Sequence, residues 1–305
     1  MMSFDRLQEK IDAMQNPTVV GLDPDLGNIP PQMLEKHVAE KGETLEAAAS
    51  AVCEFNFGLI DALCDVVPAV KPQSAFFELL GPSGVLALKQ TCDYAKEKGL
   101  YVICDGKRND IDSTAQAYAG AYLGTVKVGS AELFPFDVDA LTVSAYLGSD
   151  GIKPFIDMSA KYDKAVFALV KTSNPSSGEL QDKRIGSQTL YTAVGDLMQE
   201  ISAGTIGKYG YSRVGAVVGA TYPEEMEFLR DRLRSTFFLV PGYGAQGGSA
   251  AEAAKAFDKN GCGAIVNSSR GIIAAWKKSG GDYQSAAREE ALRMRDELRN
   301  AIGKY

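Results

Sequence analysis

The sequence predicts a (β/α)8 barrel, in which eight parallel strands form a closed central sheet surrounded by helices. Two patterns predict it: eight short apolar, β-branched runs recur along the chain, and helical patterns separate them. The length of 305 residues leaves room for insertions beyond the ~250 residues typical of this fold. The apolar runs are continuous rather than alternating, as expected of parallel strands covered on both faces. A doubly wound parallel sheet is the structural alternative.

The predicted elements follow one another in regular order. The strands are predicted over 18–23, 66–71, 100–105, 139–143, 165–171, 214–219, 236–240 and 264–267. Helical patterns cover 43–64, 81–99, 113–124, 187–207, 222–233, 249–261 and 282–302. Gly99 is expected just past the end of the second of these helices, where glycine commonly adopts a left-handed conformation. We expect one barrel domain over 1–305, with insertions at about 24–65 and 172–213.

The composition excludes several classes of protein. Hydrophobic residues make up 45% of the chain, which excludes a disordered protein, and no apolar run is long enough to span a membrane. The formal net charge is −7 and no segment is rich in Lys and Arg, which argues against nucleic-acid binding. The first residues lack the continuous apolar stretch of a signal peptide, so a cytoplasmic location is expected.

Histidine and cysteine restrict the chemistry further. The single histidine, His37, excludes sites that need two or three histidines, such as most catalytic zinc centres, and is expected on the protein surface. The odd number of cysteines and the absence of a C-x-x-C pair indicate reduced, mostly buried thiols. The five cysteines are Cys53, Cys64, Cys92, Cys104 and Cys262.

Charged and polar residues directly follow the predicted strands. The first three strands end at Asp23, Lys71 and Asp105. The fifth ends at Lys171, which Thr172 and Ser173 follow. Active sites of barrels form at the carboxyl ends of the strands, and ionisable residues are rarely buried without partners. This set of residues therefore predicts an active site.

The segment DGKRNDIDST at 105–114 contains Asp105, Lys107 and Asp110 within six positions. Asp105 and Lys107 are two positions apart, so their side chains point the same way in extended chain, and Asp110 follows beyond a turn. With Lys71 they place two positive and two negative charges near one point. We expect the positive and negative side chains to alternate in space. Two like charges side by side would shift each other's pKa until one of the groups lost its charge.

A glycine-rich segment follows the seventh strand. Gly242, Gly244 and Gly247 match the pattern G-x-G-x-x-G, but a dinucleotide-binding domain needs further strands and only one remains. In barrels, the loops after strands seven and eight often bind a phosphate group through backbone N–H groups. Arg270, which follows the eighth strand, can bind the same phosphate with two hydrogen bonds.

The chain resembles the orotidine 5′-phosphate decarboxylase family over nearly its whole length, and its insertions look like those of the longer bacterial branch. The family's motif D-x-K-x-x-D-I-x-x-T is present as Asp105, Lys107, Asp110, Ile111 and Thr114, after the preceding Lys71. The resemblance implies a barrel that decarboxylates orotidine 5′-phosphate to UMP in pyrimidine biosynthesis. It implies no cofactor and no metal.

The resemblance also implies roles for individual residues. Lys71, Asp105, Lys107 and Asp110 would form an alternating charged array, with Lys107 as the proton donor. Asp110 and Thr114 would reach the active site of a neighbouring subunit, which implies a homodimer.

The substrate-binding residues that the resemblance implies lie along the whole chain. Asp23 would bind the ribose hydroxyls and Ser173 would contact the pyrimidine. The phosphate would be held by Pro241, Gln246 and Arg270, and the loop at 172–185 and the glycine-rich segment are expected to close over the substrate. The full substrate-binding set is Asp23, Ile111, Thr114, Ser173, Pro241, Gln246 and Arg270, with Gly242, Gly244 and Gly247 in the phosphate loop.

Three other functions remain open from the sequence. Related phosphosugar decarboxylases and aldolases share D-x-K-x-x-D and use Mg²⁺, but they carry an acidic residue where this chain has Lys71, whose charge would repel a metal ion. A Schiff-base aldolase could use Lys171 or Lys71 as its amine. An inactive nucleotide-binding barrel is the third, and the intact charge array argues against it.

Overall fold

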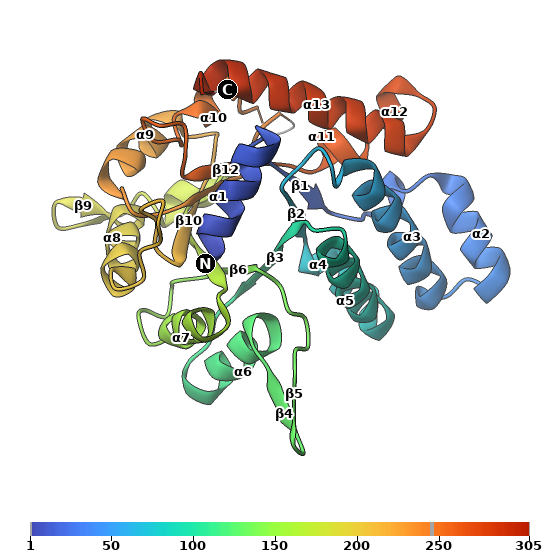
Figure 1. Ribbon diagram of the computed structural model, residues 1–305, viewed down its shortest axis with the longest axis horizontal. Coiled ribbons are helices and arrows are strands. Elements are labelled where there is room, and N and C mark those ends of the chain that lie inside the picture. Colours follow the sequence, from blue (N-terminus) through green and yellow to red (C-terminus); the bar gives the residue numbers. More distant parts are fainter. Residues whose placement is uncertain (1, 245–246, 305) are drawn as a thin grey trace.

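The computed structural model describes residues 2–244 and 247–304, and a closed barrel of eight parallel strands forms its centre (Figure 1). The predicted fold class is confirmed. The strands that form the barrel, in their order around it, are β1 (Thr18–Leu22), β2 (Ala69–Pro72), β3 (Tyr101–Arg108), β6 (Ala140–Val143), β7 (Ala165–Lys171), β10 (Val214–Val218), β11 (Phe238–Val240) and β12 (Ala264–Ser268). β12 pairs with β1 and closes the barrel, with Thr18 opposite Val266.

The barrel strands are buried on both faces, which explains their continuous apolar runs. Every residue of β1, β6, β10 and β12 is buried. The two largest differences from the predicted boundaries are at β2 and β3. β2 begins at Ala69 because the amides of Val66 and Val67 still bond to the carbonyl of Leu63 in the preceding helix. β3 runs past Asp105 to Arg108.

Helices separate the strands. The longer ones are α2 (Pro31–Lys41), α3 (Leu45–Leu63), α5 (Gly81–Glu97), α6 (Asp112–Leu123), α7 (Lys153–Tyr162), α8 (Leu190–Ser202), α9 (Pro223–Arg232) and α13 (Tyr283–Ile302). The short ones are η1 (Leu26–Asn28), α4 (Ser74–Glu78), η2 (Pro175–Glu179), α10 (Ala250–Ala254), α11 (Arg270–Ile273) and α12 (Trp276–Ser279). Gly99 follows α5 with φ +80°, as predicted. The helix predicted over 249–261 ends at Ala254. The next three amides bond to carbonyl groups three residues earlier, instead of the four of an α-helix.

Several elements had no counterpart in the sequence prediction. Two small antiparallel hairpins project from the barrel, β4 (Val126–Val128) with β5 (Ala131–Leu133), and β8 (Arg184–Ile185) with β9 (Gln188–Thr189). Their turns contain Gly129 and Gly186, both with positive φ. Helix α7 was also not predicted.

The amino-terminal helix α1 (Ser3–Met14) closes one end of the barrel (Figure 1). Its Phe4, Leu7 and Ile11 are buried in a cluster with residues at the starts of the strands, and the Phe4 ring stacks on Phe237 at 5.0 Å between centres. Helix α1 therefore covers the amino-terminal end of the barrel. The carboxyl ends of the strands, where the charged residues lie, are left for a site.

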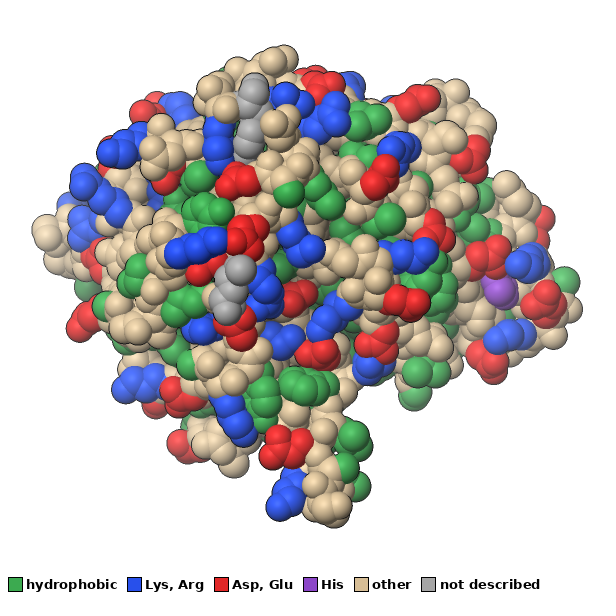
Figure 2. Space-filling view, in the orientation of Figure 1, with side chains coloured by type: hydrophobic (Ala, Val, Ile, Leu, Met, Phe, Trp, Pro, Cys, Tyr) green, Lys and Arg blue, Asp and Glu red, His purple; other side chains and the backbone are tan. Residues whose placement is uncertain are grey.

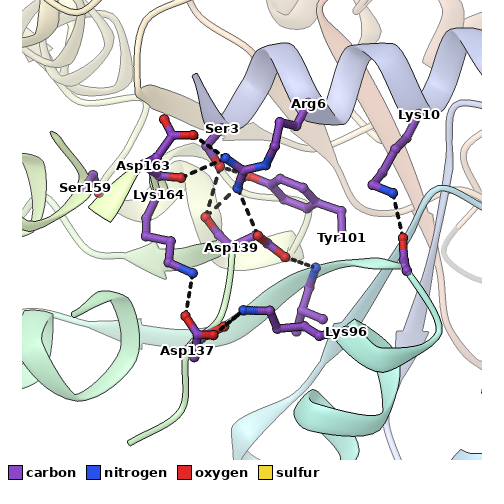
Figure 3. A network of polar contacts seen from close by, with 12 residues as sticks. Ser3, Arg6, Lys10, Lys96, Tyr101, Asp137, Asp139, Ser159, Asp163 and Lys164 are labelled. Carbon is purple, nitrogen blue, oxygen red and sulfur yellow. Dashed lines mark hydrogen bonds and ion pairs between the residues drawn. The ribbon is translucent and has the colours of Figure 1, made fainter. Parts of the chain in front are cut away.

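A network of ion pairs ties α1 to the same end (Figure 3). Arg6 on α1 lies 3.0 Å from Asp139 and also pairs with Asp163. Lys164, which is buried, lies 2.7 Å from Asp137. We give the name basal network to this group of ion-paired residues, because it lies at the end of the barrel opposite the strand-end charges. Its members are Arg6, Lys96, Asp137, Asp139, Asp163 and Lys164.

The surface and the thiols complete the comparison with the sequence. On the face shown in Figure 2, Lys and Arg side chains are interspersed with Asp and Glu and form no continuous basic stripe. Within the described ranges, no helix is both long and apolar enough to cross a bilayer.

All five cysteines are free, but only Cys92 and Cys104 are buried, so the expectation of mostly buried thiols is wrong.

Candidate active site

A cavity of about 470 Å³ opens at the carboxyl ends of the barrel strands. Its floor is apolar and consists of Leu169, Val217 and Leu239. Seven residues predicted for the site line it, namely Asp23, Lys71, Asp105, Lys107, Ser173, Pro241 and Gly242. The polar residues that line it without having been assigned a role are Gln73, Thr142, Thr172, Asn174, Gln181, Asn267 and Ser269.

Asp105 is the centre of the polar wall. Its Oδ2 accepts hydrogen bonds from Lys71 Nζ at 2.8 Å and from Gln73 Nε2 at 2.9 Å. Its Oδ1 accepts from Lys107 Nζ at 2.7 Å and from Thr142 Oγ1 at 2.8 Å. Burial alone would raise the pKa of Asp105, but the two ammonium charges outweigh it and hold that pKa well below the usual range. The carboxylate is therefore fixed in its charged form.

The two lysines beside Asp105 lie in different environments. The side chain of Lys71 is 5% exposed and that of Lys107 is 48% exposed. Burial lowers the pKa of Lys71, but the carboxylates of Asp105 and Asp23 outweigh burial and raise it. Lys71 is thus a buried, permanently charged partner of Asp105, whereas Lys107 reaches into the open cavity.

The backbone of Lys107 explains how its side chain meets Asp105. Lys107 has φ +47°, in the left-handed region, which costs on the order of 1–3 kcal/mol for a residue with a side chain. The pairing of β3 with β6 shifts between Cys104 and Arg108, and Thr142 Oγ1 accepts a 2.9 Å hydrogen bond from Lys107 N. The two side chains therefore meet through a distortion of the strand end, not through the extended chain that the sequence argument assumed.

Asp110 lies apart from the other three charges. In the described part of the chain, neither Asp110 nor Ile111 nor Thr114 lines the cavity. Asp110 Oδ1 accepts a 2.8 Å hydrogen bond from the amide of Ile111, and Ile111 and Thr114 are exposed. After Arg108 the chain leaves the barrel towards α6, so a single chain assembles three of the four predicted charges, and the expectation of all four near one point is wrong for one subunit.

The glycine-rich segment curls back on itself beside the cavity. Gly242, Gly244 and Gly247 all have positive φ, and Gly248 N donates to the carbonyl of Gly242 at 3.0 Å. Pro241 and Gly242 line the cavity, whereas Gly244 and Gly247 do not. Gln246 lies outside the described residues.

Arg270 begins the short helix α11 and is exposed, and it too is absent from the cavity lining of the described residues. The residue before it, Ser269, lines the cavity.

Lys171 does not reach the cavity. Its side chain is fully buried and its Nζ lies 2.5 Å from Asp182 Oδ1. A lysine in this setting is not available to a carbonyl substrate, so the Schiff-base hypothesis for Lys171 is not supported.

Comparison with known proteins identifies the family. Residues 36–280, more than half of the chain, match the Orotidine 5'-phosphate decarboxylase / HUMPS family. The chain belongs to this family. An orotidine 5'-phosphate decarboxylase of Rhodopirellula baltica is 44% identical over 307 residues, covering 98% of this chain and 100% of that protein. One from Caldicellulosiruptor bescii is 40% identical over 304 residues, covering 99% and 100%.

A solved structure agrees with these relatives. The OMP decarboxylase of Leishmania donovani superposes with a TM-score of 0.72 at 32% identity, covering 97% of this chain and 100% of that one. The resemblance stated from the motif is confirmed.

Sequence reasoning assigned no role to several polar residues of this decarboxylase-family site. Gln73 lies two positions after Lys71, and Thr142 lies in the strand predicted over 139–143, so alternation along an extended chain was an available signal for both. Asn267 ends the eighth predicted strand and could have been found by the strand-end rule. Gln181 lies in the long loop after β7, and no local pattern marks it.

Acid titration tests the charge state of Asp105. Because its folded pKa lies below the unfolded value of about 3.9, the ionised carboxylate stabilises the fold above about pH 4, and this contribution is lost as the pH falls. We expect Asp105→Asn to flatten the decline in the free energy of unfolding between about pH 4 and pH 2. Urea unfolding of both proteins at matched pH measures this, and identical slopes would contradict the assignment.

Proposed function

We propose that this chain catalyses the decarboxylation of orotidine 5′-phosphate to UMP in pyrimidine biosynthesis, without a metal or organic cofactor. The observation that carries the proposal is Asp105 held in its charged form between Lys71 and Lys107 in the wall of the cavity. Membership of the family supports it. We further propose that the whole chain acts as one barrel domain with two insertions, in the cytoplasm.

The proposed chemistry needs a fixed positive charge. Loss of CO₂ from C6 of the pyrimidine leaves a carbanion without a conventional electron sink. The ammonium of Lys107 would stabilise that charge and then deliver a proton to C6, and one preorganised group of this kind contributes about 10²–10³ in rate. Lys107 suits this role because its ammonium reaches the cavity while Asp105 fixes it at 2.7 Å. Asp105 would also repel the departing carboxylate.

Two buried acceptors support binding of a sugar. Asp23 Oδ1 and Asn267 Oδ1 are buried, line the cavity and have no hydrogen-bond partner among the described residues. Buried acceptors without partners are costly, and ribose hydroxyl groups would supply the missing donors. We propose Asp23 for the ribose and Ser173 for the pyrimidine, with Pro241, Gln246 and Arg270 at the phosphate. Gly242, Gly244 and Gly247 would let the phosphate loop adopt its curled path.

The position of Asp110 supports a homodimer with shared active sites. Asp110, Ile111 and Thr114 lie outside their own chain's cavity, so a role in catalysis requires a neighbouring subunit. Large apolar side chains are exposed on three loops that follow the adjacent strands β2, β3 and β6, and burying them would favour association. They are Leu79, Ile111, Tyr146 and Leu147, at 75%, 48%, 78% and 47% exposure.

An ultraviolet assay with orotidine 5′-phosphate tests the proposed function. We expect the purified protein to convert the substrate to UMP, and we expect excess EDTA to leave the rate unchanged. Dialysis against EDTA before the assay, followed by addition of Mg²⁺, is the control for a tightly held ion. Absence of conversion by folded protein would favour a phosphosugar enzyme of the same barrel class instead. Conversion that returns only with Mg²⁺ would contradict the proposal that no metal is needed.

A further inference from the structure

Lys171 is a fully buried ammonium at the end of β7, directly before the residues that face the substrate cavity. Its Nζ lies 2.5 Å from Asp182 Oδ1, which comes from the far end of the following loop. The ring centres of Tyr222 and Tyr191 lie 4.2 and 5.5 Å from the same nitrogen. A charge in such a setting is stable only while its counter-charge stays in place.

A second link lies beside this ion pair. The side chain of Gln181 accepts a 2.9 Å hydrogen bond from Thr172 N and donates one of 2.7 Å to Thr172 Oγ1. Lys171–Asp182 and Thr172–Gln181 therefore join the two ends of the loop 173–180, and we call these four residues the neck. The loop that the neck closes presents Ser173 and Asn174 to the cavity.

Tyr222 connects the neck to the loop itself. Its hydroxyl accepts a hydrogen bond from Ser177 Oγ at 3.2 Å and donates one of 3.3 Å to the carbonyl of Asn174. The same ring lies over the ammonium of Lys171. The buried charge, the loop ends and the substrate-facing residues are thus in one set of contacts.

We propose that Lys171 and Asp182 are positioning residues, which hold the loop 173–180 in its substrate-facing arrangement before the substrate arrives. Withdrawing Asp182 with the loop would leave Lys171 buried without a counter-charge, so the open arrangement is disfavoured. The neck therefore restricts the closing movement that the sequence predicts for 172–185. The inference rests on the proposed function only for the identity of the substrate.

Asp182→Asn tests the proposal because it removes the charge and keeps the shape. In this variant the loop 173–180 would be ordered in only a fraction of the free molecules, and the apparent affinity for substrate falls in proportion to that fraction. Saturating substrate shifts the population back to the ordered loop, so kcat is retained. We expect KM for orotidine 5′-phosphate to rise about tenfold, with kcat within about twofold of the wild type. Hydrogen exchange at the amide of Thr172, which bonds to Gln181, should accelerate without substrate present. Asp182→Glu should partly restore both values.

A matched control separates positioning from stability. Lys164 is also buried and lies 2.7 Å from Asp137, but this pair belongs to the basal network at the opposite end of the barrel (Figure 3). Asp137→Asn should lower Tm as Asp182→Asn does, yet leave KM and the exchange of Thr172 unchanged. All rates are compared well below the lowest Tm.

A double variant keeps the test decisive if Asp182→Asn folds poorly. Lys171→Met with Asp182→Asn removes both charges, so Tm should recover while KM stays raised. If KM returns to the wild-type value together with Tm, or if Asp182→Asn changes neither KM nor Thr172 exchange, the proposal is wrong. Wild-type protein that does not convert the substrate would refute the proposed function alone, because the exchange measurement needs no substrate.

Discussion

Lys107→Ala is expected to lower kcat for orotidine 5′-phosphate by at least about 10³-fold. The same ammonium would stabilise the developing carbanion and supply its proton, so the variant loses both contributions at once. The fold should survive, because the side chain of Lys107 is about half exposed and Asp105 keeps Lys71, Gln73 and Thr142 as partners. Alanine at this position keeps the left-handed backbone conformation, with φ +47°, so the strand end keeps its strain.

The measurement is single-turnover decarboxylation together with thermal unfolding. Lys127→Ala is the control, since Lys127 is an exposed lysine on β4, away from the cavity lining. Near-normal turnover by Lys107→Ala would remove Lys107 from the role of proton donor. A loss of activity accompanied by unfolding would be resolved by Lys107→Arg, which keeps a positive charge without a readily transferred proton.

Mixing two inactive variants is expected to restore activity. Asp110→Ala should lose at least about 10²-fold in kcat, because it removes one charge from the proposed array. In a dimer with Lys107→Ala, one site receives both altered residues and the other receives neither. Equal mixing with free exchange of subunits should therefore recover about a quarter of the wild-type activity.

The mixed-dimer experiment depends on proof that subunits exchange. Differently tagged variants, purified in sequence on both tags, isolate the mixed dimers and measure their share. Mixed dimers that remain inactive would show that Asp110 acts within its own chain or not at all. Mixing Lys107→Ala with itself under the same conditions gives the background.

The barrel and its charged strand ends were predictable because buried parallel strands have a simple pattern. Strands covered on both faces must be apolar throughout, so Asp23, Lys71 and Asp105 were conspicuous at their ends. The position of each strand also implied that these three side chains would meet at one end of a closed sheet. The wider cavity wall was harder to predict. Thr142 is a single polar residue within an apolar run, and its role depends on the partner across the strand pair.

Elements that depend on distant contacts escaped prediction. Helix α1 carries Phe4, Leu7 and Ile11 at helical spacing, but the sequence alone does not show that these side chains pack against the end of the barrel. The hairpin of β4 and β5 has strands of three residues each, too short for a periodic signal. The pairing of Lys171 with Asp182 required the path of the intervening loop, which no local pattern specifies.

The closure of the barrel by its first and last strands has a consequence for synthesis on the ribosome. Phe4 stacks on Phe237, and β1 pairs with β12, so both amino-terminal segments are synthesised well before the partners that bury them. At bacterial or eukaryotic translation rates this delay lasts on the order of 10 s or more. During that time the apolar face of α1 and one unpaired edge of β1 are exposed to other chains. Protection of the nascent chain during translation is therefore expected to raise the yield of folded protein.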